Sequence, residues 1–364
     1  MHIVKQRTIV VLYPELAGYT LACLQSLITE HNVVVHVFRL AVNKDAPFEF
    51  NAVQGLHFYN ESDYTAAQLL TTVSALQPQL IYCAGWNNSK YLHVVRYLQN
   101  IPAVLCFDNK WIGSLKQRLG SLYARVRITP YFTHVFVAGE QQKKLALHMG
   151  FAPAQVQLGV YAANVPHFDE LYKKYVSYKL TKTTPRRFVY SGRYVAYKGI
   201  ETLWQAFIKL CDENPAMNWE LWCVGTGTIA SASPSHHAAN IHPRIKHFGF
   251  VQPAVMEQII KDTDVFVLPS IIEPWGVVAH EFAAAGFTMV LSNAVGAKEL
   301  FLTTANGFEC EANNLESLKN ALLKCTQLST AELSAMSLQS NVLGNSYTPS
   351  HWANKVVAMM GRNK

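Results

Sequence analysis

The sequence lacks the features that mark membrane-spanning, secreted or disulfide-bonded chains. No stretch approaches the 18 or so uninterrupted apolar residues of a transmembrane helix, and the first 30 residues lack the basic, apolar and small regions of a signal peptide. The seven cysteines form no CxxC pair and most lie in apolar runs. We therefore expect a cytoplasmic, soluble protein whose cysteines are reduced core residues.

Metal-ligand patterns and disordered tracts are also missing. None of the 14 histidines belongs to an HExxH motif or to a His/Cys cluster with zinc spacing, so we expect no protein-bound metal and no resident cofactor. Charged residues make up only 15% of the chain, and no long Ser/Gly/Pro or acidic tract occurs. This composition argues against extended disorder.

The chain does contain enough apolar residues for two cores. Half of its 364 residues are hydrophobic, and this length exceeds that of one typical domain. The net charge of +7 is uneven, because residues 1–165 carry 13 Lys/Arg against 8 Asp/Glu. Such an excess does not by itself decide between anionic lipid, phosphorylated substrates and nucleic acid, and no motif here indicates nucleic acid.

Short β-rich apolar runs alternate with segments of helical spacing, which is typical of βαβ units on a parallel sheet. In the first half they are residues 8–12, 33–38, 80–84, 103–107 and 134–138. After a polar, basic interval the pattern restarts at residues 188–192, 219–225, 245–250, 264–270 and 288–292. The sequence therefore predicts an α/β protein with two doubly wound, Rossmann-like domains, at residues 1–165 and 166–346.

The last segment, residues 347–364, predicts a helix that docks on the first domain. Thr348 is a suitable N-cap, followed by a proline at the first helical position. Trp352, Val356, Val357 and Met360 would then line one face.

The most informative segment is LPSIIEPWGVVAHEFAAAG at 268–286, a buried strand that runs into a turn and a helix. If the helix begins near Gly276, Glu281 lies about five residues into it, about 7.5 Å along the helix axis, while Glu273 stays in the loop. The N–H groups of Gly276, Val277 and Val278 could bind phosphate oxygens with the help of the helix dipole. In isolation, the two glutamates would be better interpreted as a helix cap and a surface acid.

Two further loops place suitable groups at the ends of strands, where doubly wound sheets bind ligands. Gly192 ends one strand, and Arg193 and Lys198 follow it. The Arg193 guanidinium could bind phosphate through two hydrogen bonds and Lys198 could add a compact charge, so that together they could neutralise a diphosphate. Gly225 follows another strand in CVGTGT, a weak signal because GxG loops are common. Alone, the two cations could equally be surface residues beside a turn.

In this order, the segments SGRYVAYKGIETLWQAF, WELWCVGTG, IKHFGFVQPAVMEQIIKDTDVFVLPS, EPWGVVAHE and GFECEANNLESLKNAL resemble the carboxyl domain of family 4 retaining glycosyltransferases. The resemblance covers residues 188–323 and implies the GT-B fold, in which two Rossmann-like domains face each other across a cleft and a C-terminal helix crosses back to the first. It also implies a nucleotide diphosphate sugar as donor, and we expect UDP or GDP as its nucleotide.

The resemblance assigns roles to these residues. Arg193 and Lys198 would contact the donor diphosphate, Glu273 the sugar hydroxyls, and Glu281 the ribose. Catalysis would involve Arg193, Lys198, Glu273 and Asp108. The implied donor-binding set is Gly18, Gly192, Gly225, Phe250, Val251, Trp275, Gly276, Val277, Val278 and Glu281.

The first domain departs from the family's pattern. The loop YPELAGYT at 13–20 has only Gly18 where the family usually has a pair of glycines. After the strand at 103–107 many members have a histidine, whereas this chain has Asp108 within Phe-Asp-Asn. Asp108 could contact the reacting sugar or acceptor hydroxyl, or it could cap the loop.

Residues 110–127 combine cations with apolar side chains. Lys110, Lys116, Arg118, Arg125 and Arg127 occur without an acid, and apolar residues lie between them at spacings of three and four. This pattern fits a basic amphipathic helix on anionic lipid, in keeping with a lipid-linked glycan acceptor in bacterial surface-polysaccharide assembly. It fits an ordinary packed helix equally well. A second basic stretch at 171–187 could be a hinge or another lipid or phosphate contact.

Two other functions remain open on the sequence. A GT-B nucleotide-sugar epimerase would share the fold and the nucleotide pocket, and a non-catalytic nucleotide-sugar-binding protein would fit the unusual first domain. A dinucleotide-dependent oxidoreductase is disfavoured because no GxGxxG, with an acid about 20 residues further on, follows Leu12 or Val224. The nucleotide base, the sugar, the acceptor and the linkage are not specified by these motifs.

Overall fold

A computed structural model describes residues 6–40, 53–182, 185–231 and 242–361. The chain divides into two compact units, Met1–Asn164 with Thr348–Lys364, and Val165–Tyr347. The units divide after residues 164 and 347, each one residue from the predicted boundaries after residues 165 and 346. Residues 362–364, which the prediction included in the terminal segment, lie outside the described residues.

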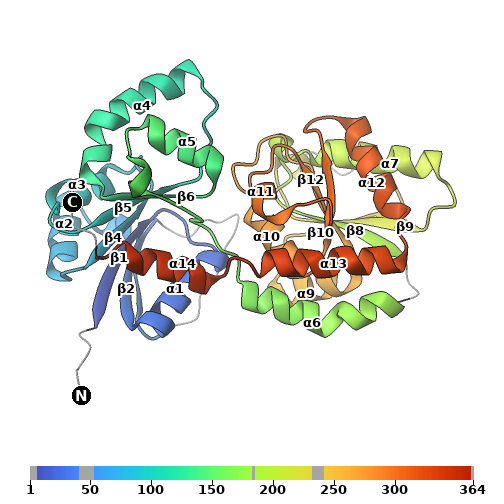
Figure 1. Ribbon diagram of the computed structural model, residues 1–364, viewed down its shortest axis with the longest axis horizontal. Coiled ribbons are helices and arrows are strands. Elements are labelled where there is room, and N and C mark those ends of the chain that lie inside the picture. The colour runs from blue at the N-terminus through green and yellow to red at the C-terminus, as the bar shows by residue number, and fades with distance from the viewer. Residues whose placement is uncertain (1–5, 41–52, 183–184, 232–241, 362–364) are drawn as a thin grey trace. The chain divides into compact units, whose positions relative to one another are not determined.

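The first unit is built on a seven-stranded, fully parallel sheet of order β3-β2-β1-β4-β5-β6-β7. Helices α1 and α14 lie together on one side of this sheet, and α4 and α5 lie on the other (Figure 1). The strands are β1 (Arg7–Tyr13), β2 (Val33–Arg39), β3 (Leu56–Asn60), β4 (Leu80–Ala84), β5 (Ala103–Phe107), β6 (His134–Val137) and β7 (Val156–Leu158). The helices are α1 (Gly18–His31), α2 (Ala66–Ala75), α3 (Ser89–Tyr97), α4 (Leu115–Arg127), α5 (Glu140–His148) and α14 (Pro349–Ala358).

The second unit has a six-stranded parallel sheet of order β10-β9-β8-β11-β12-β13. Helices α7 and α12 pack together on one side, and α6, α9, α10 and α13 cover the other (Figure 1). The strands are β8 (Arg186–Ser191), β9 (Trp219–Val224), β10 (Ile245–Gly249), β11 (Val265–Leu268), β12 (Thr288–Ser292) and β13 (Gly307–Cys310). The helices are α6 (Val165–Thr181), α7 (Ile200–Glu213), α8 (Thr228–Ser231), α9 (Pro253–Asp262), α10 (Val277–Ala284), α11 (Lys298–Phe301), α12 (Leu315–Thr326) and α13 (Thr330–Gly344).

Both sheets are buried on their two faces, which explains their sequence. Parallel strands covered by helices read as continuous apolar runs, and Val10 in β1, Val104 in β5 and Val290 in β12 are completely buried. All seven cysteines are free and buried, as predicted. Within the described residues, no helix has the length and apolar character needed to cross a membrane.

The basic stretch at 171–187 is not a hinge. Most of it forms α6, which packs on α9, α10 and α13. At its end, Lys182 and Arg186 both pair with Asp264, at 2.7 and 2.8 Å. These cations are therefore used to hold the second unit together.

The terminal helix α14 belongs to the first unit, as the sequence predicts. The Thr348 side chain accepts a hydrogen bond from the His351 amide, and Pro349 occupies the first turn. Trp352 is buried, and its Nε1 donates to the Val160 carbonyl at 3.0 Å. The predicted buried face is partly wrong, because Met359 is buried whereas Val357 and Met360 are only half-buried.

Replacement of Trp352 should test how strongly α14 stabilises the first unit. The indole contacts the rings of Tyr82 and Phe136, at centroid distances of 5.6 and 6.3 Å. We expect Trp352→Ala to lower the free energy of unfolding by about 3–5 kcal/mol because it leaves a cavity and an unpaired carbonyl. Asn354→Ala, on the exposed face of the same helix, should change it by less than about 0.5 kcal/mol in urea denaturation. Equal effects would contradict this role.

Candidate functional site

The predicted donor residues of the second unit lie at the carboxyl edge of its sheet. Because all six strands are parallel, the loops that follow them emerge at the same edge. β8 leads to Arg193 and Lys198, β9 to Gly225, β10 to Phe250 and β11 to Glu273. Residues from sequence positions far apart are thereby gathered on neighbouring strands.

Backbone hydrogen bonds join the loops after β8, β9 and β10. The Gly192 amide donates to the Val224 carbonyl at 3.0 Å, and the Gly225 amide donates to the Gly249 carbonyl at 2.8 Å. Gly225 has a φ of +129°, and a Cβ there would lie 1.9 Å from the Gly192 carbonyl oxygen. Gly225 is therefore required first by the contact between two loops of the protein, rather than by the approach of a ligand.

The structure brings Lys198 and Glu273 together as an ion pair. Lys198 Nζ contacts Glu273 Oε2, and the two side chains are only 16% and 8% exposed. Ser270 donates a second hydrogen bond to the same carboxylate oxygen at 3.0 Å. A carboxylate shielded from water is thereby given two donors, which offsets part of its desolvation.

The loops that carry this pair are fixed by their backbones. The Tyr197 carbonyl accepts hydrogen bonds from the Ile271 and Ile272 amides, at 2.8 and 3.1 Å. On the other side, the Gly296 amide donates to the Glu273 carbonyl at 3.2 Å. The ion pair therefore lies in a rigid frame built from the loops after β8, β11 and β12.

Arg193 lies beside the pair and is exposed. Its Nη2 donates to the Tyr197 hydroxyl at 2.6 Å. The Tyr197 ring centroid lies 5.8 Å from the Arg193 guanidinium carbon and 5.9 Å from Lys198 Nζ. One aromatic ring thus separates two cations at this edge, an arrangement suited to an extended anion such as a diphosphate.

Helix α10 begins next to this pair. Gly276 precedes the helix with a φ of +94°, a left-handed conformation that favours glycine, and a Cβ there would approach Glu273 Cγ to 3.1 Å. The helix geometry leaves the amides of the first turn, at Val277 and Val278, without intrahelical acceptors. Such amides and the helix dipole form an anion-binding position.

Glu281 is the fifth residue of α10, about 6 Å along the axis from Val277. Burial raises the pKa of its carboxyl group to about 7. Within the described residues the carboxyl group has no hydrogen-bond or ion-pair partner. A half-buried, unpaired carboxyl beside an anion position is available to accept hydrogen bonds from hydroxyl groups of a ligand.

Other predicted donor residues differ in exposure. Phe250 is 43% exposed and Val251 is half-buried after β10. Trp275 is 3% exposed, so its ring packs in the interior, and its Nε1 has no acceptor among the described residues. In the first unit Gly18 begins α1, and an added Cβ would meet no described atom within 4 Å. The binding roles of these residues stay predictions.

Asp108 follows β5 at the carboxyl edge of the first sheet, near tyrosines that no sequence motif indicates. Its backbone carbonyl accepts a hydrogen bond from Gln142 Nε2 at 3.0 Å. Burial raises the pKa of Tyr161 and of Tyr13, and the Asp108 charge adds to both shifts. Tyr19 and Tyr161 contact edge to face at 5.5 Å. The position of Tyr13 at the end of the first strand could have indicated this cluster.

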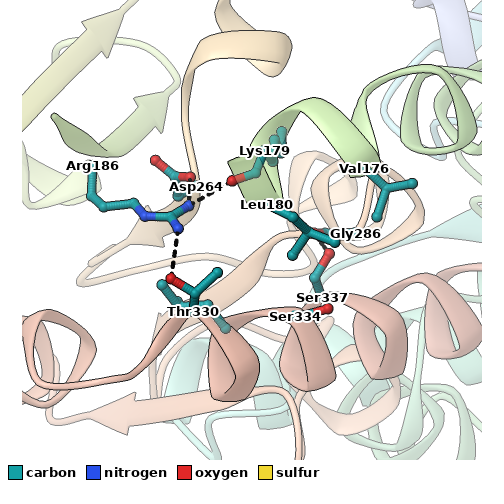
Figure 2. A pocket seen from close by; sticks show the side chains of 10 residues that line it. Val176, Lys179, Leu180, Arg186, Asp264, Gly286, Thr330, Ser334 and Ser337 are labelled. Atoms are coloured by element: carbon teal, nitrogen blue, oxygen red, sulfur yellow. Dashed lines mark hydrogen bonds and ion pairs between the residues drawn. The ribbon is translucent and has the colours of Figure 1, made fainter. Parts of the chain in front are cut away.

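A small cavity in the second unit lies at the opposite end of the strands. Arg186, the first residue of β8, contacts Asp264 and Thr330 at its wall (Figure 2). Burial lowers the pKa of the neighbouring Lys179 to about 7, and its Nζ lies 3.7 Å from the Phe287 ring centroid. Asp264 already pairs with Arg186 and Lys182, and this cluster is separate from the carboxyl edge that carries the predicted donor residues.

The fold defines a class. Two Rossmann-like α/β domains in one chain are typical of the GT-B fold, and solved structures of that class match nearly the whole chain. A glycosyltransferase from Rickettsia africae has a TM-score of 0.75 at 14% identity and covers 98% of both chains. HepE of Anabaena, in complex with UDP and glucose, has a TM-score of 0.71 at 14% identity, over 96% of this chain and 98% of that one.

The sequence comparisons concern mainly the second unit. Residues 185–327 match the model of the family described as glycosyl transferases group 1. An uncharacterized glycosyltransferase of Methanocaldococcus jannaschii is 30% identical over 131 residues, which are 36% of this chain and 33% of the relative. The chain thus spans about a third of that relative's length. The predicted resemblance to group 1 glycosyltransferases is confirmed, and the narrower family 4 stays a prediction.

The interaction between Lys198 and Glu273 can be measured with a double-mutant cycle. We expect Lys198→Met to lower the free energy of unfolding by about 3 kcal/mol because it leaves a buried carboxylate without its counter-charge. Addition of Glu273→Gln should recover part of the loss, with a coupling energy of about 2 kcal/mol in urea denaturation. The exposed pair Lys209 and Glu316 should give less than about 1 kcal/mol with the same substitutions. Similar coupling energies at both pairs would show that burial does not strengthen the interaction between Lys198 and Glu273.

Proposed function

We propose that the chain is a retaining glycosyltransferase of the GT-B type that moves a hexose-type sugar from a nucleotide diphosphate sugar to a hydroxyl of a glycan or lipid-linked acceptor. The observation that carries the proposal is the shielded Lys198–Glu273 pair next to the first turn of α10. It combines a cation and free amides for a diphosphate with a carboxylate for sugar hydroxyls. The likeness of the fold to HepE, solved with UDP and glucose, supports a UDP-sugar, with a GDP-sugar as the alternative.

In this proposal the diphosphate is bound by groups that are already in place. Arg193, Lys198 and the amides of residues 276–278 offset the charge that develops as the sugar–phosphate bond breaks. Glu273 accepts hydrogen bonds from the sugar hydroxyls, and Glu281 accepts them from the ribose. Because protein cations and the helix dipole supply the positive charge, we propose that no metal ion and no other cofactor are needed.

Retention would follow from attack on the face that the leaving group occupies. The bond between the anomeric carbon and the phosphate oxygen breaks, and a bond to the acceptor oxygen forms on the same side. The acceptor proton passes to the departing phosphate, so no protein nucleophile is required. Asp108, at the carboxyl edge of the first sheet, is the proposed contact for the reacting sugar or the acceptor hydroxyl.

We place the reaction in bacterial surface polysaccharide or lipopolysaccharide synthesis, at the cytoplasmic side of the membrane. The outward apolar and basic surface of α4, described below, supports the lipid-linked form of acceptor.

Activity variants test the donor site directly. We expect Lys198→Ala and Glu273→Ala each to lower kcat for transfer about 100-fold to 1000-fold, since each removes a preorganised group from the transition state. Lys209→Ala and Glu316→Ala remove exposed charges on α7 and α12 and should leave kcat within about twofold. Incubation of the donor without acceptor distinguishes transfer from epimerisation. Nucleotide binding without turnover over a broad donor and acceptor panel would contradict the proposal.

Glu281 should make donor binding depend on pH. Its pKa is raised to about 7, so the carboxyl is mostly protonated at pH 6 and mostly ionised at pH 8. Because the ionised form accepts hydrogen bonds from the ribose hydroxyls, affinity for a nucleotide sugar should rise about tenfold between these pH values. A nucleotide sugar is used because its diphosphate does not titrate there. Glu281→Gln should abolish the slope in calorimetric titrations, and an unchanged slope would exclude this role.

A further inference from the structure

Helix α4 in the first unit directs its large apolar side chains away from the protein. Only Ser121 and Ala124 of this helix are buried, so small residues form its inner face. The residues with outward side chains, between 59% and 75% exposed, are Ile112 just before the helix, and Leu115, Leu119, Leu122, Tyr123 and Val126 within it. The large apolar side chains of this helix are therefore not packed in the domain core.

The outward stripe is flanked by cations on both sides. At 100° per residue, the apolar positions from Leu115 to Val126 cover an arc of about 100°. Lys116 and Arg127 lie along one margin of this arc, and Arg118 and Arg125 lie along the other. All four side chains are exposed, and none has an ion-pair partner among the described residues.

The stripe is held in place by local hydrogen bonds. Ser114 caps the helix by accepting from the Gln117 amide. Gln117 Oε1 accepts from the Ile112 amide at 2.7 Å, and its Nε2 donates to the Lys110 carbonyl at 2.6 Å. At the other end, Arg96 Nη2 donates to the Arg127 carbonyl at 3.1 Å. The turn before the helix is therefore fixed to its first turn, and Ile112 within this turn is exposed.

The charges beside the apolar stripe of α4 limit which kind of partner can cover it. Residues 109–139 contain no Asp or Glu, so the surface offers positive charge with no acid of its own. Pairing of two copies through this face would bring cations against cations around the apolar stripe. A phospholipid surface with anionic headgroups supplies both a counter-charge for the four cations and an apolar layer for the stripe.

We propose that α4, together with Ile112, is a membrane-interface helix that lies in the plane of an anionic phospholipid bilayer. Its leucines and Val126 enter the region below the headgroups, and Lys116, Arg118, Arg125 and Arg127 contact the phosphates. This proposal does not rest on the glycosyltransferase activity. If both hold, the first unit lies at the surface where a lipid-linked acceptor would be found.

Co-sedimentation of the full-length chain with vesicles tests the proposal. We expect binding to vesicles of phosphatidylcholine mixed with phosphatidylglycerol and little binding to phosphatidylcholine alone. Each cation removed should weaken binding about fivefold, so Lys116→Gln with Arg125→Gln should weaken it about 25-fold. Leu119→Ser with Leu122→Ser should also release the protein. The matched control is Leu338→Ser with Val342→Ser on α13, which removes two equally exposed apolar residues from the second unit.

A fluorescent label reports which side of the helix meets the lipid. All seven native cysteines are buried, so Leu122→Cys and, as control, Leu338→Cys can be labelled selectively with an environment-sensitive dye. We expect a blue shift with anionic vesicles at position 122 and none at 338. Three results would overturn the proposal. The protein could fail to bind anionic vesicles, or it could bind neutral vesicles equally well. It could also self-associate in a way that persists when vesicles are added and that Leu119→Ser with Leu122→Ser abolishes. None of these outcomes would affect the donor site, which transfer to a water-soluble acceptor measures separately.

Discussion

The arrangement of the second unit depends on the contact between Lys198 and Glu273, which are 75 residues apart in the chain. A lysine and a glutamate shielded from water stabilise a fold only when their geometry is fixed and their remaining polar atoms are satisfied. Here the Tyr197 carbonyl joins the two loops, and Ser270 supplies the second donor to the carboxylate. The same frame sets the start of α10 and therefore the position of its free amides.

The two ends of the second sheet show why charge alone does not identify a site. At the amino end, Asp264 is paired with both Lys182 and Arg186, so its carboxylate is satisfied by the protein. At the carboxyl end, Arg193 is exposed and Glu281 is left without a partner among the described residues. The site proposed for the donor is thus the end where charged and polar groups remain available to a ligand.

Much of the fold could be predicted from the sequence because buried parallel strands are continuous apolar runs. The predicted strands at 80–84, 103–107 and 288–292 match β4, β5 and β12. The strands β3, β7 and β13 were missed. The side chains of β3 are mostly half-buried or exposed, and β7 and β13 have only three and four residues, so none has the long apolar signal of a central strand.

The candidate site was predictable only in part. The sequence places Arg193, Lys198 and Glu273 at one edge because the carboxyl ends of parallel strands meet there, and the structure has them at that edge. Their motifs do not reveal that Lys198 pairs with Glu273 or that Ser270 donates to the same carboxylate. The requirement for Gly225 beside the Gly192 carbonyl is likewise a contact between distant loops. For α4 the helical period predicted an apolar stripe, yet periodicity does not specify which side faces the core.

The most direct test of the donor site is a crystal structure of the protein soaked with UDP or GDP. The account predicts diphosphate density against the amides of residues 276–278, within hydrogen-bond distance of Arg193 or Lys198, with the ribose against Glu281. Diphosphate density at any other position, or none at saturating nucleotide, would contradict it.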